Sequence, residues 1–451
     1  MTDRASDDST APAARTAPLA RHVAAVVMGN GLEFYDFLTY AYFAVYIGRT
    51  FFPSHNAGSS LLLSLATFGA GFLTRPIGAI VIGSMGDRIG RRPAMMLSFS
   101  LMGVAIIGLA LTPSYHRIGI AAPILVIAFR LLQGFALGGE VGPTTAYLVE
   151  AAPIGRRGFY ASMQNATQDA SALLAGVIGT VLASLLTAQQ LQDWGWRVAM
   201  IVGASIVPWG LLIRRRLPET LHAADDAALA PDGATGIAAP TGVRPYLPII
   251  VFGLMMLAAG TIGTYVIDYM TTYALTVLKM PPTVSFGVII VTGATAVVFE
   301  LLSGLLSDKY GRKPVMIIPA AVLLVSIFPS FWVISHFRAV PTFYATAAWL
   351  SMLAALASTP VIVTLTETLP KRIRAGGVAT VYAFAISIFG GSTQFVITGL
   401  LQVTGNPLAP AFYWTIAAVV GITAMILVRE SSPVKAAQRT ERLALAASAA
   451  P

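Results

Sequence analysis

The sequence predicts an all-α membrane protein with twelve transmembrane helices in two six-helix, pseudo-symmetric bundles. The 451 residues are 56% hydrophobic and only 11% charged, whereas a soluble domain usually has about 25% charged residues. Apolar runs long enough to cross a bilayer recur along the chain, and a charged motif of the first half returns in the second. The chain has no cysteine, which leaves no disulfide framework and no thiolate metal site.

The twelve apolar runs are separated by Pro, Gly and charged residues. Their approximate bounds are 20–47, 59–84, 94–112, 119–147, 158–187, 196–215, 246–277, 283–306, 314–336, 341–367, 376–403 and 408–429. The Ala-, Gly- and Pro-rich interval between the sixth and seventh runs has the composition of a linker. We therefore expect a disordered cytoplasmic tail (1–19), a first bundle (20–215), a cytoplasmic linker (216–245), a second bundle (246–429) and a cytoplasmic tail (430–451).

The basic residues predict the orientation in the membrane. Most of the 29 Lys and Arg residues fall in segments that are cytoplasmic if the N-terminus lies inside. The outer loops then hold Arg49, Arg117, Arg197, Lys279 and Arg338. The positive-inside rule therefore places both termini in the cytoplasm. The net charge of +9 is mostly a topology signal, so no nucleic-acid partner is expected.

The two halves share a motif. GSMGDRIGRRP (83–93) follows the second run, and GLLSDKYGRKP (304–314) follows the eighth. A weaker repeat pairs YLVEAAPIGRRG, which contains Glu150, with TLTETLPKRIRAG, which contains Glu367. Two parallel six-helix repeats around a central cavity are an architecture of secondary transporters.

The first copy of the motif resembles the cytoplasmic loop signature of the major facilitator superfamily. It matches G-x-x-x-D-R-x-G-R-R at Gly83, Asp87, Arg88, Gly90, Arg91 and Arg92. RLLQGFALGGEVG (130–142) looks like the fourth-helix signature, and GNGLEFYDF (29–37) with RPIGA (75–79) resembles the metabolite:proton symporter branch. Within that branch, GFYASMQNATQ (158–168), WGWR (194–197) and IFGGSTQ (388–394) are most similar to the citrate–proton symporters and the tricarballylate carrier.

This resemblance implies import of citrate or a related di- or tricarboxylate with protons, by alternating access, through a bacterial inner membrane. Asp169 and Asp268 depart from it, because uncharged residues are usual there in citrate carriers, and Glu300 is a third unexpected acid. The alternative within the branch is a zwitterionic osmolyte such as proline or betaine, or a shikimate-like acid. In that case Asp169 or Asp268 would meet a cationic group.

The first predicted helix carries Glu33 and Asp36 inside an apolar run. A carboxylate at membrane depth is unfavourable unless it is paired, protonated or faces a water-filled cavity. Asn30 lies one turn before this pair and Tyr40 one turn after it, so the four side chains form a stripe. The stripe is either a polar clamp between helices or a pathway for solute and protons.

Acids outnumber bases in the predicted spans. The acids are Glu33, Asp36, Glu140, Asp169, Asp268 and Glu300, and the bases are Arg75 and Arg130. Because such an excess cannot all be ionised in a low-dielectric interior, some of these acids are expected to exchange protons. We predict that Glu33 or Asp36, together with Asp169, carries the coupled proton.

The predicted substrate-binding residues are polar side chains inside the spans: Arg130, Asn30, Tyr40, Gln164, Arg75 and Gln394. The Arg130 guanidinium can hold a carboxylate through two parallel hydrogen bonds, and Gly134 and Gly138 would let another backbone approach beside it. The alternative for Arg130 is a permanent ion pair with Glu33 or Asp36. Arg75 precedes Pro76, which loosens the helix, and the uncharged members of this set could equally link helices.

The repeated cytoplasmic motifs predict a gate formed by Asp87, Arg88, Arg91, Glu150, Asp308 and Arg312. Alternating access needs ion pairs that form and break as the halves rock. The alternative for the arginines is a role in topology alone, but Asp87 has no topological use.

No phosphate-binding loop, H-E-x-x-H motif or serine-nucleophile motif occurs in the sequence. We therefore expect a transporter that is not an enzyme and has no cofactor or metal. A membrane sensor or an intramembrane enzyme is a remote alternative. The expected partners are a small organic acid, protons and the lipid bilayer, with the protein acting as a monomer.

Overall fold

The computed structural model describes residues 34–35, 37–54, 56–89, 91–138, 152–215, 247–369 and 371–432, and the single residues 27, 31 and 148. Within these ranges, only the backbone is described for 83–84, 86–88, 91–92, 94–95, 154, 206, 209–215, 371–376 and 379. Every regular element in the described ranges is a helix. This agrees with the predicted all-α class.

The helices of the first half alternate between long apolar elements and short connecting turns. They are α2 (Ala44–Phe51), α3 (Ala57–Leu73), α4 (Arg75–Ile89), α5 (Arg91–Leu111), α6 (Tyr115–Ile118), α7 (Ala121–Leu137), η1 (Ile154–Arg156), α9 (Arg157–Leu185), α10 (Ala188–Gln190), η2 (Leu191–Gly195) and α11 (Trp196–Arg215). The second half has the same character. It comprises α13 (Leu247–Asp268), α14 (Met270–Tyr273), η4 (Ala274–Leu278), α15 (Pro282–Tyr310), α16 (Arg312–Phe337), α17 (Val340–Thr368), α18 (Lys371–Ala385), η5 (Ile386–Gly390), α19 (Gly391–Thr404) and α20 (Ala409–Leu427).

Eight helices of the described residues are long and apolar enough to cross a membrane. Their bounds are Ala57–Ile82, Arg157–Leu185, Leu247–Leu278, Pro282–Tyr310, Arg312–Phe337, Val340–Thr368, Thr380–Thr404 and Ala409–Leu427. Each overlaps a run predicted from the sequence, so these eight predictions are confirmed. The tail 1–19, the linker 216–245 and most of the tail 430–451 lie outside the described residues, and the domain boundaries stay predictions.

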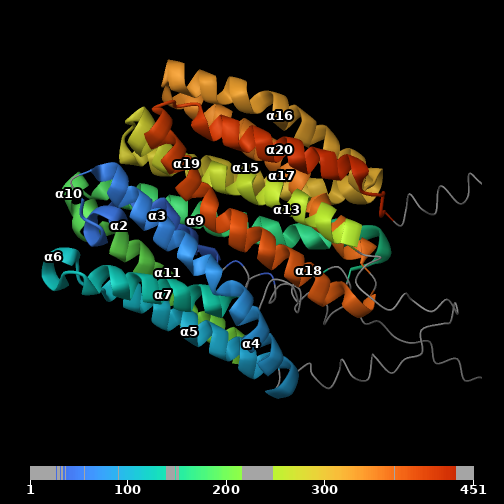
Figure 1. Ribbon diagram of the computed structural model, residues 1–451, viewed down its shortest axis with the longest axis horizontal. Helices are drawn as coiled ribbons and strands as arrows, with labels where there is room; N and C mark the ends of the chain where they lie inside the picture. Colours follow the sequence, from blue (N-terminus) through green and yellow to red (C-terminus); the bar gives the residue numbers. More distant parts are fainter. Residues whose placement is uncertain are drawn as a thin grey trace, which may run out of the picture.

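The long helices lie side by side, with α16 and α20 along one edge and α4 and α5 along the other (Figure 1). The contacts between the two halves run through small residues. On α9 and α15, a Cβ added to Gly304 would come within 2.7 Å of the Gly158 carbonyl oxygen, and one added to Gly176 would meet Ile289 at 2.8 Å. On α3 and α19, a Cβ on Gly69 would collide with the Gly391 carbonyl oxygen. These two seams hold the halves together.

Close backbone approach also places Arg130 against the second predicted span. A Cβ on Gly134 would collide with the Gly71 carbonyl oxygen, and one on Gly138 with that of Arg75. The sequence-based expectation for these two glycines is therefore confirmed. The same span is interrupted at Thr74, because Pro76 has no backbone N–H to donate. Thr74 instead donates from Oγ1 to the Leu131 carbonyl at 2.6 Å, which ties the break to α7.

Candidate functional site

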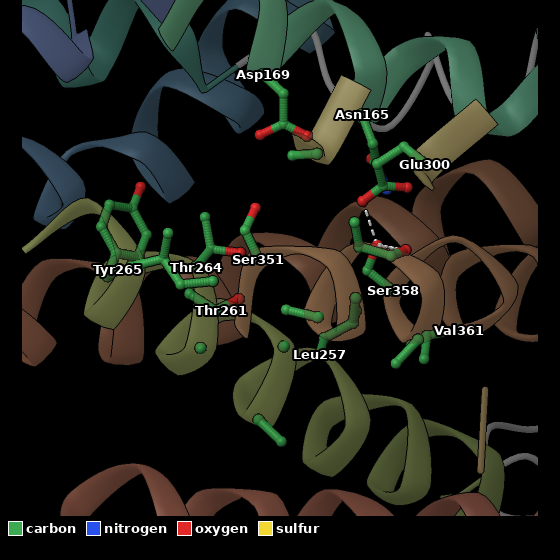
Figure 2. Close-up of a pocket in the computed structure, with 18 of the residues that line it drawn as sticks. Asn165, Asp169, Leu257, Thr261, Thr264, Tyr265, Glu300, Ser351, Ser358 and Val361 are labelled. Atoms are coloured by element: carbon green, nitrogen blue, oxygen red, sulfur yellow. Dashed lines mark hydrogen bonds between the residues drawn. The ribbon is translucent and has the colours of Figure 1, made fainter. Parts of the chain in front are cut away.

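A cavity of about 210 Å³ lies between the two halves. Its walls come from α9 of the first half and from α13, α15, α16, α17 and α20 of the second, with Tyr42 and Tyr382. Figure 2 shows Asn165 and Asp169 reaching from one side, and Thr261, Thr264 and Tyr265 facing them from the other. The charged side chains among the described lining residues are all acids, namely Asp169, Asp268 and Glu300.

Glu300 is only 4% exposed and is held by donors from both halves. Ser358 donates to Oε1 and Thr359 donates to Oε2, both from α17. From the first half, Asn165 donates its Nδ2 to Oε2 at 3.3 Å. A buried carboxyl surrounded by such donors meets the general requirement that buried polar atoms be paired.

Asp268 and Asp169 are less fully paired than Glu300. The Tyr42 hydroxyl donates to Asp268 Oδ1 at 2.9 Å, again from the first half to the second. The other oxygen, Oδ2, is buried without a hydrogen-bond partner in the described part of the chain. Asp169 interacts electrostatically with both Glu300 and Asp268, and no hydrogen bond to its carboxyl comes from the described residues. The three acids thus form one electrostatic group, hereafter the cavity carboxyls.

Two buried arginines lie among aromatic rings of the first half. Arg130 is 1% exposed; its Nη1 donates to Gln133 Oε1 at 2.5 Å, and its guanidinium lies 4.4 Å from the Tyr40 ring centroid. Arg75 is 7% exposed, with its guanidinium 4.3 Å from the Phe72 ring and 4.5 Å from the Phe37 ring. Phe37 also contacts Arg130, at 4.6 Å. Such cation–π contacts stabilise a desolvated guanidinium without neutralising it.

Arg75 has a charge that the described residues do not balance. No described carboxylate lies within the 4.0 Å salt-bridge distance of Arg75, and its Nε is buried without a hydrogen-bond partner in this part of the chain. A buried cation that lacks a counter-ion is unfavourable, and within the described part of the chain no carboxylate fills that role for Arg75. Tyr265, which lines the cavity, lies within electrostatic range of both Arg75 and Arg130.

The predicted site residues are distributed over several places. Asp169 lies in the cavity wall, while Arg130, Tyr40, Gln164, Arg75 and Gln394 are buried outside the described lining. Asn30, Glu33, Asp36 and Glu140 lie outside the described residues. The acidic stripe, its pairing with Arg130 and all of these roles therefore stay predictions.

Sequence reasoning missed Tyr42 as the partner of Asp268. Tyr42 stands two positions after Tyr40, and a helical stripe continues at three or four positions, so the pattern favoured Tyr40. Tyr40 instead donates its hydroxyl to the Ser64 carbonyl at 3.3 Å. No signal in the sequence shows which residue of the opposite half an interior tyrosine will meet.

At the end of the bundle where α15 ends and α9 begins, charged groups connect the halves. Asp308 accepts hydrogen bonds from the backbone nitrogens of Gly158 at 2.8 Å and Phe159 at 2.9 Å. Arg312, 1% exposed, donates to Asp308 at 2.8 Å and to both oxygens of Glu367 at 3.1 and 3.2 Å.

Arg157 of the first half lies 3.8 Å from Glu367, which adds a second contact between the halves. Glu367 was not among the predicted gate residues, although the weaker repeat paired it with Glu150. Glu150 and the side chains of Asp87, Arg88 and Arg91 lie outside the described set, so the gate of the first half stays a prediction.

Comparison with known proteins identifies the family. A family model described as "Sugar (and other) transporter" matches residues 22–223. A citrate-proton symporter of Salmonella typhi is 36% identical over 412 residues, covering 90% of this chain and 93% of the relative. The chain belongs to the metabolite:proton symporter branch of the major facilitator superfamily.

Other members of this branch are similar over most of their length. A citrate-proton symporter of Klebsiella pneumoniae is 34% identical over 420 residues, 92% of both chains. A putative proline/betaine transporter of Staphylococcus aureus (strain COL) is 32% identical over 405 residues, 88% of this chain and 86% of the relative.

The major facilitator proton:xylose symporter bound to 6-bromo-6-deoxy-D-glucose has a TM-score of 0.74 at 16% identity, covering 92% of this chain and 96% of that one. This last likeness concerns the fold alone.

Proposed function

We propose that this protein is a proton-coupled symporter that imports citrate or a related di- or tricarboxylate across the bacterial inner membrane. In this proposal twelve transmembrane helices form two six-helix halves, and both termini are cytoplasmic. The observation that carries it is the 34–36% identity to citrate-proton symporters over about nine-tenths of the chain. The cavity between the halves provides a place for the solute.

Transport proceeds by rocking of the halves along two seams, α9 with α15 and α3 with α19. Backbones meet through glycine at both seams, so few side chains have to repack during the motion. The contacts of Asp308, Arg312 and Glu367 form in the state that is closed to the cytoplasm and break in the state that is open to it. Arg75 and Arg130 provide positive charge for the carboxylates of the solute, and Gln164, Gln394, Tyr40 and Asn30 provide neutral hydrogen-bonding groups.

A second candidate is a zwitterionic solute such as proline or betaine. Two observations favour it. One relative is named as a putative proline/betaine transporter, and the charged residues among the described cavity lining are all acids. An ammonium group could pair with a cavity carboxyl, while the solute carboxylate pairs with an arginine.

The test uses purified protein in proteoliposomes with an imposed pH gradient, acidic outside. Radiolabelled citrate, other di- and tricarboxylates, proline, betaine and shikimate are offered separately. We expect accumulation of a carboxylate that a protonophore abolishes and a sodium gradient does not replace. Accumulation of proline or betaine alone would establish the second candidate, and sodium-driven uptake insensitive to protonophore would exclude proton coupling.

A further inference from the structure

Two hydrogen bonds cross between the halves and end on a carboxyl of the second half. Tyr42 donates to Asp268 at 2.9 Å, and Asn165 donates to Glu300 at 3.3 Å. Both donors belong to the first half, so rocking of the halves changes both distances. Because ionised carboxylates accept hydrogen bonds more strongly than neutral acids, the strength of these two links depends on whether the carboxyls hold protons.

Asp169 connects the two links. It lies on α9, one turn after Asn165, and interacts electrostatically with both Asp268 and Glu300. The groups that face these acids are neutral in the described part of the chain. Tyr42 and Tyr265 adjoin Asp268, while Asn165, Ser358 and Thr359 adjoin Glu300. Two buried arginines, Arg75 and Arg130, interact electrostatically with Tyr265, and Arg75 also interacts with Tyr382.

The charge of the cavity wall has a direct consequence for an anionic solute. Three ionised carboxylates around a cavity of about 210 Å³ repel one another and repel a di- or tricarboxylate. Proton binding removes this repulsion and turns each carboxylate into a hydrogen-bond donor. Asp268 Oδ2 already lies buried and without a described partner, so it is a place where a proton can reside.

We propose that Asp169, Asp268 and Glu300 together are the proton-loading site, and that protons bind there before the organic anion enters. The links from Tyr42 and Asn165 then couple loading to the movement of the halves. This inference rests on the proposed symport of an organic acid and adds the residues and the order of binding. Glu33 and Asp36 lie outside the described residues and are not needed for it.

The test compares two assays on the same proteoliposomes. One is accumulation of citrate driven by a pH gradient, and the other is citrate exchange at equal pH on both sides, which needs no net proton movement. The variants are Asp169→Asn, Asp268→Asn and Glu300→Gln. Asp193→Asn is the matched control, because Asp193 is exposed and, among the described residues, its carboxyl accepts hydrogen bonds only from Gln189 on the same surface.

We expect the cavity variants to lose accumulation by at least about tenfold while exchange continues and becomes insensitive to pH. A further variant, Tyr42→Phe, leaves every acid in place. The pH at which the exchange rate is half-maximal should rise, because ionised Asp268 loses the hydrogen bond from the Tyr42 hydroxyl and accepts a proton more readily. This variant keeps the inference testable even if an acid substitution prevents folding.

Three results would overturn the inference. Unchanged accumulation and unchanged pH dependence in the three acid variants would place the protons elsewhere. Loss of exchange as well as accumulation, in variants that elute and unfold like the parent, would mean that the carboxyls bind the solute directly. If the unmodified protein accumulates no carboxylate under a pH gradient, the proposed function itself fails, and this outcome appears before any variant is made.

Discussion

Asp308 Oδ1 lies 2.8 Å from the backbone nitrogen of Gly158, so a carboxylate of the second half caps a helix of the first. Gly158 and Phe159 stand in the first turn of α9, where backbone N–H groups have no intrahelical acceptor and carry partial positive charge. In the repeated motif, Asp308 occupies the position that Asp87 has in the first copy. This acid therefore has a use that membrane topology does not explain.

The first prediction concerns this cap. Asp308→Asn should favour the state that is open to the cytoplasm, because the amide retains only one acceptor oxygen and no charge. Loss of one of the two accepted hydrogen bonds costs about 1 kcal/mol, which corresponds to about a fivefold change in population. The chain has no cysteine, so a single Ser162→Cys, at a buried position between α9 and α15, reports opening by its rate of maleimide labelling. Equal labelling in Asp308→Asn and in the Asp193→Asn control would contradict the prediction.

The second prediction concerns the buried ion pairs of Arg312. This side chain donates to Asp308 and to both oxygens of Glu367, and removing one partner of a buried pair costs about 3–5 kcal/mol. Arg312→Ala should therefore lower the thermal unfolding midpoint in detergent strongly. Arg312→Lys should lower the midpoint less, because a lysine retains the charge but cannot form the bidentate contact with Glu367.

The matched control for Arg312 is Lys309→Ala, in the last turn of α15. Lys309 is exposed, and its Nζ lies 5.2 Å from the ring centroid of its neighbour Tyr310. Its replacement should leave the midpoint nearly unchanged. Equal midpoints for Arg312→Ala and Lys309→Ala would show that the Arg312 cluster does not stabilise the fold.

The third prediction concerns the α9 and α15 seam. In Gly304→Ala, the new Cβ would lie 2.6 Å from Ser162 Oγ and 2.7 Å from the Gly158 carbonyl oxygen. The helices must separate to admit it, at a cost of about 1–3 kcal/mol. Both the unfolding midpoint and the transport rate should fall, whereas Gly399→Ala, where a Cβ meets nothing within 4 Å, should affect neither. A normal rate in Gly304→Ala would mean that the seam tolerates separation during transport.

Much of the architecture could be predicted because it depends on patterns local in the sequence. The eight long helices follow from runs of apolar residues, and the close approach of another backbone at Gly134 follows from small residues at helical spacing. Asp169, Asp268 and Glu300 stood out as unexpected acids, and the structure brings all three to one cavity. Their charge, rare at membrane depth, was the signal.

The partners of these acids could not be predicted in the same way. Tyr42 reaches Asp268 and Asn165 reaches Glu300 across more than a hundred positions of sequence. These pairs depend on the register between two halves, which neither helical periodicity nor the internal repeat specifies. Glu367 was missed for a related reason: the repeat drew attention to it, but its pairing with Arg312 becomes visible only when α16 and α17 lie side by side.

The fourth prediction concerns Arg130, whose guanidinium lies over the Tyr40 and Phe37 rings. If it binds a solute carboxylate, Arg130→Gln removes a charge-assisted pair of about 1.5–3 kcal/mol, which corresponds to about a 10–150-fold loss of affinity. Arg130→Lys should recover only part of this loss, because an ammonium neither stacks on Tyr40 as a flat group nor donates two parallel hydrogen bonds. The measurement is the concentration dependence of citrate exchange, with Arg117→Gln on the exposed surface as the control. Unchanged exchange of every carboxylate tested in Arg130→Gln would assign this arginine to packing within the first half and leave Arg75 as the described cation able to receive the anion.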